Sequence, residues 1–166
     1  LKIDISTGDV ITPCEISFSY QLMFENRTIP LLAYPPETVL AEKLETILSR
    51  GEANTRLRDF YDVYILQRED FVVTPDALCH ALLATCRKRR HEDLLHTYAS
   101  ILDRVRQSDT MRTQWMKYQS DFDYAAGITW DTVLDTVETL CMKTLDDHAF
   151  GDELPQEESQ FEMHLL

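Results

Sequence analysis

The sequence predicts an α+β protein in which a small, mostly antiparallel sheet is followed by a helical lobe of five or six helices. In residues 1–6 and 16–24, apolar and polar side chains alternate with a period of two, which is typical of strands. From residue 36 onward the apolar residues recur every three or four positions, as they do on helices. Strands that are followed by a run of helices, rather than alternating with them, indicate the α+β class.

Three strands are expected before residue 35. In residues 1–6, Lys2, Asp4 and Ser6 share one face of the first strand. A loop precedes the second strand, which is predicted over residues 16–24 from strict alternation. A turn at residues 25–28 leads to a shorter third strand over residues 29–34, which Pro30 confines to an edge or a bulge.

The helices are predicted from their apolar stripes and from their start and stop residues. The first begins at Pro36 and ends at Gly51, since proline suits the first turn and glycine the end of a helix. Thr74 followed by proline predicts another start, and Thr129 is expected to cap the last helix. The remaining helices are expected over residues 57–68, 92–106 and 109–124, and the last over 130–147.

The charge of the chain is uneven. The net charge is −13, but residues 119–166 hold 12 acidic and one basic residue, whereas residues 1–118 hold 17 and 15. Residues 151–166 contain five acids and no base, which predicts a solvated acidic tail. A basic run lies at residues 87–90. Charge alone therefore neither demands nor excludes a nucleic-acid partner.

Cysteine usage and hydropathy predict a cytoplasmic protein. Cys14, Cys79, Cys86 and Cys141 are widely spaced and have no close histidine or cysteine companions. We favour four reduced, mostly buried thiols over disulfides or zinc ligands. No apolar stretch approaches the roughly 20 residues needed to span a bilayer, and the sequence shows no signal-peptide pattern, so no membrane association is expected.

Residues 54–64 form the densest group of charged and aromatic residues. On a helix, Asp59 and Asp62 share a face, and Arg58 reaches Asp62 four positions on. One interpretation is an amphipathic helix with local ion pairs on its exposed face, each worth about 0.3–0.5 kcal/mol. The other is a site for metal-assisted phosphoryl chemistry, to which Arg56 would also contribute.

Two further residues are candidates for the same chemistry. Lys43 lies near the apolar stripe of the first helix, either as a snorkelling lysine or as an amine in a cleft between sheet and helix that meets a phosphate. Asp4 places a carboxylate on the polar face of the first strand, where a solvent-facing residue is the default interpretation.

Residues 2–6 (KIDIS), 40–44 (LAEKL) and 56–62 (RLRDFYD) together resemble the AbiEii/AbiGii toxin nucleotidyltransferases of bacterial abortive-infection and toxin–antitoxin systems. The resemblance covers residues 1–68 well. For the remaining residues it extends only to their being helical. The last segment is similar to the family's Arg-x-Lys-Asp-x-x-Asp motif, with Arg58 in the lysine position.

The resemblance implies a fold similar to DNA polymerase β and transfer of a nucleotide from an NTP to an acceptor such as tRNA. It implies that three carboxylates hold magnesium, with Asp4 as the third. Lys43, Arg56 and Arg58 would bind the substrate by neutralising phosphate charge. The other predicted catalytic residues, Asp59 and Asp62, would orient these basic side chains or act on the acceptor hydroxyl. A cognate antitoxin is the implied partner.

The sequence departs from the family at its start. It has no Gly-Ser or Gly-Gly loop followed by an Asp-x-Asp motif before Asp4. Asp121-Phe122-Asp123 has the same letters, but it lies in an expected helix far downstream, where we expect the chemistry not to assemble. We therefore expect a carboxyl-terminal part of the enzyme: a partial nucleotidyltransferase core over residues 1–68, a helical lobe over 69–150 and a tail over 151–166. With one carboxylate, magnesium binding would be weak or absent, and the chain alone would be inactive.

Two other hypotheses remain open. The chain is a non-catalytic interaction module that binds a protein partner through its helices, or it assembles with a separate chain that supplies the missing strands. An open sheet edge also predicts self-association or partner binding.

Overall fold

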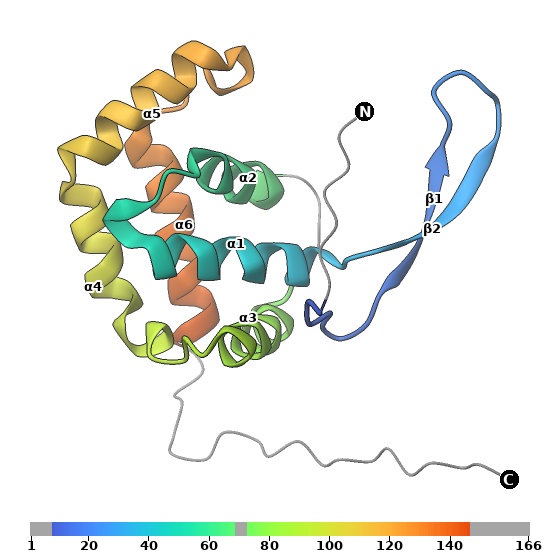
Figure 1. Cartoon of the computed structure of the whole chain (residues 1–166), viewed down its shortest axis with the longest axis horizontal. Coiled ribbons are helices and arrows are strands. Elements are labelled where there is room, and N and C mark those ends of the chain that lie inside the picture. The colour runs from blue at the N-terminus through green and yellow to red at the C-terminus, as the bar shows by residue number, and fades with distance from the viewer. Residues whose placement is uncertain (1–7, 69–72, 147–166) are drawn as a thin grey trace, which may run out of the picture.

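The structure, a computed structural model, describes residues 8–68 and 73–146 as a β-hairpin followed by a body of helices (Figure 1). The two strands are antiparallel, and the α+β prediction is confirmed. The predicted first strand, residues 1–6, lies outside the described residues. The elements are β1 (Ile16–Gln21), β2 (Thr28–Ala33), α1 (Pro36–Arg50), α2 (Leu57–Arg68), α3 (Pro75–Arg89), α4 (Leu94–Gln107), α5 (Asp109–Asp121) and α6 (Trp130–Leu145), with short 3₁₀ turns η1 (Gly51–Ala53) and η2 (Asp123–Ala125).

The helices begin and end where the sequence places capping residues. Pro36 occupies the first turn of α1, and Gly51 ends the helix with φ of 48°, a conformation that glycine adopts without the penalty other residues carry. The hydroxyls of Thr74, Ser108 and Thr129 accept hydrogen bonds from the first free N–H groups of α3, α5 and α6. Each of these local signals is readable from the sequence, and each fixes a helix boundary.

Two helices organise the core. α1 packs against α2, α3 and α4, and α6 packs against α2, α3, α4 and α5. Phe60 of α2 is fully buried, with its ring centroid 5.0 Å from that of Trp130 at the start of α6. The apolar core is continuous from α1 to α6, so helices on both sides of residue 68 share it. The division of the chain at residues 68 and 150 stays a prediction.

The cysteines in the described part of the chain are free. Cys14 is exposed, and Cys79, Cys86 and Cys141 are buried. Burial raises the pKa of the Cys86 and Cys141 thiols to about 12, so both stay protonated near neutral pH. The predicted burial of most of the thiols is confirmed.

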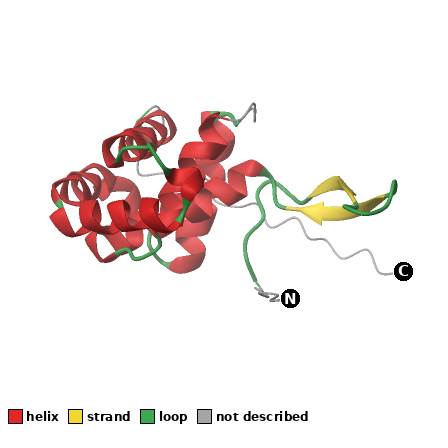
Figure 2. Ribbon diagram, turned by 90° about the horizontal axis from the view of Figure 1, so that it is seen from above, coloured by secondary structure: helices red, strands yellow, loops and turns green. Residues whose placement is uncertain are grey.

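The hairpin stands apart from the helices (Figures 1 and 2). Its register pairs Phe18 with Leu31 and Tyr20 with Ile29, so apolar side chains from both strands share one face. This face is not covered by the described helices, because Phe18 is 51% and Leu31 44% exposed. An isolated two-stranded hairpin is marginally stable in water, which predicts that the apolar face and the free edges take up a partner.

We expect the protein to self-associate or to bind a partner through this hairpin. Replacing Phe18 and Leu31 together by serine should shift the mass measured by light scattering toward the 19.3 kDa of one chain. Leu32→Ser is the matched control, because Leu32 is more exposed but lies on the opposite face of the hairpin. A clean monomer at high concentration, before any substitution, would contradict the prediction.

Candidate functional site

The charged motif forms the entry and the first two turns of α2. Asn54 is fully buried, and its side-chain oxygen accepts a hydrogen bond of 2.7 Å from the backbone N–H of Arg56. This local turn fixes the chain direction before α2 begins at Leu57. Asp59 falls in the first turn of α2, where a carboxylate is favoured by the helix dipole. The basic and acidic residues of the motif are therefore oriented by its local sequence.

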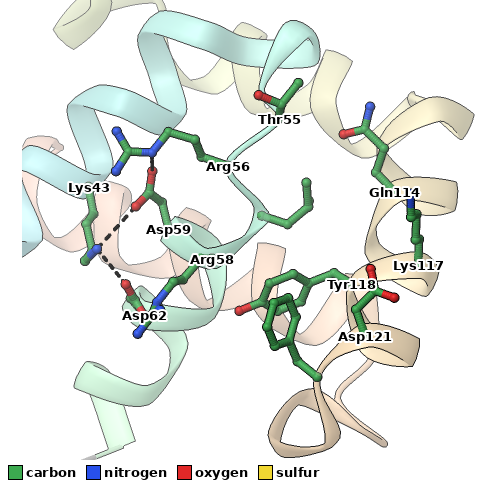
Figure 3. A pocket seen from close by; sticks show the side chains of 12 residues that line it. Lys43, Thr55, Arg56, Arg58, Asp59, Asp62, Gln114, Lys117, Tyr118 and Asp121 are labelled. Carbon is green, nitrogen blue, oxygen red and sulfur yellow. Dashed lines mark hydrogen bonds and ion pairs between the residues drawn. The ribbon is translucent and has the colours of Figure 1, made fainter. Parts of the chain in front are cut away.

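Lys43 of α1 lies between the two carboxylates of α2. Its Nζ is 2.6 Å from Asp62 Oδ2 and 3.2 Å from Asp59 Oδ1 (Figure 3). Asp59 is 3% exposed, so its charge is removed from water and needs such a partner. The side chain of Lys43 is 20% exposed, which is more enclosed than a snorkelling lysine would be. One lysine thus neutralises two acids and links α1 to α2.

The arginines take part in the same cluster from its outer side. Arg56 Nε lies 3.0 Å from Asp59 Oδ2, as an ion pair without the alignment of a hydrogen bond. Arg58 Nε lies 3.7 Å from Asp62 Oδ1, the pairing at four residues that the sequence predicts. The side chains of Arg56 and Arg58 are 56% and 75% exposed. Both side chains are therefore open to a ligand from the solvent side.

A second group of charges fixes α1 from its other side. Glu45, 1% exposed, is paired with Arg89 at the end of α3, and its Oε1 lies 2.7 Å from His91 Nδ1. Arg89 also lies 3.9 Å from Glu42. These contacts hold α3 against α1 within one turn of Lys43, so they determine where the lysine meets α2. Sequence reasoning missed this group, because residues 45 and 89 are brought together by packing alone.

The cluster forms one wall of a pocket of about 590 Å³. The opposite wall is α5, with Gln114, Lys117 and Tyr118 (Figure 3). Among the described residues, the pocket is lined by helices and by the segment that leads into α2. Whether Lys43 also faces a sheet stays a prediction, because the first predicted strand lies outside the described residues. Lys43, Arg56, Arg58, Asp59 and Asp62 are brought together as predicted, whereas Asp4 lies outside the described residues and its place at the site stays a prediction.

Sequence reasoning missed the contribution of α5. Lys117, Tyr118, Asp121 and Phe122 line the pocket at helical spacing, which would have shown that they share a face but not which element they meet. The expected helix at Asp121-Phe122-Asp123 is confirmed only for Asp121, and the expectation that the metal chemistry does not assemble there stays a prediction. α5 ends at Asp121, Asp123 opens η2, and both Asp121 and Phe122 line the pocket.

Fold and site together define an α+β protein whose helices enclose a pocket of paired acids and exposed arginines. The model of the family described as nucleotidyl transferase AbiEii toxin, type IV toxin–antitoxin system, matches residues 1–136. This match spans most of the chain, and the chain belongs to that family. No curated protein and no solved structure matches the chain.

The family match extends the resemblance beyond residue 68, into α6. It includes α5 and η2, and thus both walls of the pocket. Membership makes this chain one of the nucleotidyltransferase toxins and implies an antitoxin as its counterpart. Among the helices that the structure describes, none is long and apolar enough to cross a membrane.

Nucleotidyltransferases generally use magnesium, which is held by oxygen ligands. No group of three acidic, histidine or cysteine side chains in residues 8–68 and 73–146 is placed to hold a metal ion. Asp59 and Asp62 are two hard oxygen donors, but the ammonium of Lys43 lies between them. Magnesium needs near-octahedral oxygen coordination, and a cation already occupies this position. The described residues therefore do not fit magnesium.

Removing the lysine should destabilise the protein. In Lys43→Ala, Asp59 keeps only the neighbouring Arg56 as a partner, so we expect a loss of about 1–3 kcal/mol in the free energy of unfolding by urea. Lys117→Ala, an exposed change on the opposite wall, should stay within about 0.5 kcal/mol of wild type.

The double variant Lys43→Ala/Asp59→Asn should recover part of the lost stability, because it removes the buried charge together with its partner. Equal stability of wild type and Lys43→Ala would show that the lysine does not compensate the buried acid.

Proposed function

We propose that this chain is part of an AbiEii nucleotidyltransferase, which transfers a nucleotide from an NTP to an acceptor such as tRNA. In this proposal the pocket of the chain neutralises the charge of the NTP phosphates. The observation that carries the proposal is the arrangement of charge in the pocket. Both acids of α2 are paired with basic partners, whereas the side chains of Arg56 and Arg58 are more than half exposed. Planar guanidinium groups match phosphate oxygens and form two parallel hydrogen bonds with them.

The contacts favour distinct roles for the five clustered residues. Arg56 and Arg58 are the groups that contact phosphate, because their side chains are more than half exposed. Lys43 adds positive charge behind them. For Asp59 and Asp62 the family leaves two roles, orienting the bases or acting on the acceptor hydroxyl. Orienting the basic residues fits better, since both carboxylates already form ion pairs with Lys43.

The proposed reaction is attack of an acceptor hydroxyl on the α-phosphorus of the NTP. The new bond joins the hydroxyl oxygen to that phosphorus, the bond to the β-phosphate bridging oxygen breaks, and pyrophosphate leaves with its electron pair. The hydroxyl proton passes to a base outside the five clustered residues. Positive charge beside the phosphates stabilises the charge that develops on their oxygens in the transition state.

We infer that the chain by itself is inactive. Two carboxylates of the pocket are committed to Lys43, and the described residues hold no group of three side chains placed to bind a metal ion. Asp4 would add at most one carboxylate ligand. Productive binding of an NTP with its metal therefore requires carboxylates and a phosphate-seating loop beyond these groups.

Complementation tests the proposal. The chain is mixed with the amino-terminal half of another AbiEii enzyme, which carries the Gly-Ser and Asp-x-Asp motifs, and incorporation of α-³²P-labelled nucleotide into tRNA is measured with each NTP. We expect incorporation only in the mixture. Arg58→Ala should reduce the rate by about 100-fold, as removal of one charge-stabilising donor does elsewhere. Lys88→Ala, a basic residue of α3 outside this pocket, is the matched control.

Incorporation by the chain alone would overturn its inferred inactivity. An unchanged rate in Arg58→Ala would overturn the role of the arginines. No incorporation and no NTP binding under any condition would favour the alternative of a non-catalytic interaction module.

A further inference from the structure

A cluster of aromatic rings continues the pocket on its α5 side. We call it the aromatic shelf, and it consists of Tyr61, Tyr118, Phe122 and Tyr124. The ring centroids of Tyr118 and Phe122 are 4.7 Å apart, those of Phe122 and Tyr124 5.4 Å, and those of Tyr61 and Tyr124 4.8 Å. The hydroxyls of Tyr118 and Tyr124 lie 2.9 Å apart. These contacts join the end of α5, η2 and α2 into one surface.

Core packing explains only part of the shelf. The ring of Tyr118 stacks on the buried Trp115 at 5.3 Å and thus belongs partly to the core. Phe122 and Tyr124 are 41% and 48% exposed. Exposed aromatic surface beside a polar pocket is typical of a binding site.

Basic groups lie beside the shelf. Tyr118 extends from α5 toward Arg58 (Figure 3), and the guanidinium of Arg58 and the carboxylate of Asp62 both act on the pKa of its hydroxyl. Burial is the main cause of the raised pKa of Tyr118, so this hydroxyl stays protonated. The pocket is lined by the basic residues Lys43, Arg56, Arg58 and Lys117 and by the acids Asp59, Asp62 and Asp121. Its exposed arginines thus adjoin an aromatic surface.

We propose that the aromatic shelf stacks unpaired bases of a single-stranded nucleic acid whose phosphates meet Lys117, the basic residue on the α5 wall of the pocket. Aromatic faces with adjacent cations are the common means of holding single strands, because every base has a π-face. The shelf extends beyond the pocket, since Tyr61 and Tyr124 are not among the pocket's lining residues, and so it offers more surface than the base of one nucleotide needs. This inference rests on the proposed function, for which it supplies the acceptor side.

Fluorescence anisotropy with a 5′-labelled, eight-nucleotide single-stranded RNA at low salt tests the shelf. Phe122→Ala should weaken binding by about 5- to 100-fold, as the loss of one stacked base does. Phe122→Leu keeps apolar volume without a ring and should weaken it similarly, whereas Phe122→Trp should retain it. Met116→Ala is the matched control, because Met116 is an exposed apolar residue of α5 outside the pocket. Thermal unfolding of each variant checks that the fold is kept.

The same RNA annealed to its complement should bind more weakly, since its bases are no longer free to stack. Binding unaffected by Phe122→Ala, equal binding of the duplex, or no binding at all would overturn the shelf. A loss of NTP affinity in Phe122→Ala without loss of RNA affinity would assign the shelf to the nucleotide instead and overturn the proposal. Failure of nucleotide transfer in the complementation experiment leaves these RNA affinities measurable, so the two proposals fail separately.

Discussion

The site depends on one buried electrostatic constraint, the neutralisation of Asp59 and Asp62 by Lys43. Asp59 is almost completely removed from water, and an isolated buried carboxylate is too costly to retain its charge. Because its partner comes from α1 and the acids come from α2, the same contact sets the distance between the two helices. The arginines at the entry of α2 are then left on the outer side of the cluster, facing the pocket.

The position of Lys43 depends in turn on how α1 is held. Glu45, two residues further along α1, is paired with Arg89 at the end of α3 and with His91 just beyond it. α1 thus carries a lysine paired with acids of α2 and a buried glutamate paired with basic residues at and just after the end of α3. Ionic contacts of this kind contribute little net stability compared with apolar packing, but they allow few alternative arrangements of the helices. Here these contacts fix the positions of the charged side chains at the pocket.

Much of the fold follows from short-range signals in the sequence. The predicted bounds of α2 agree with the structure, and Pro36, Gly51, Thr74 and Thr129 mark helix ends through chemistry that acts within a few residues. Strand 16–24 is shorter in the structure, because β1 ends at Gln21 and the chain turns before Phe24. The site residues that lie on α1 and at the start of α2 were predicted from the sequence. The α5 wall, the Glu45 group and the aromatic shelf were not, because they join residues distant in sequence through packing, which periodicity does not encode.

The most direct test of the account is a titration of the chain with Mn²⁺, followed by the electron paramagnetic resonance signal of the free ion. If Lys43 occupies the position between Asp59 and Asp62, the chain should show no site with a dissociation constant in the micromolar range that depends on these two acids. Asp59→Asn and Asp62→Asn should then leave the titration unchanged. A tight site in the wild-type chain that is lost in either variant would show that the two carboxylates hold a metal ion, and it would contradict the assignment of both to Lys43.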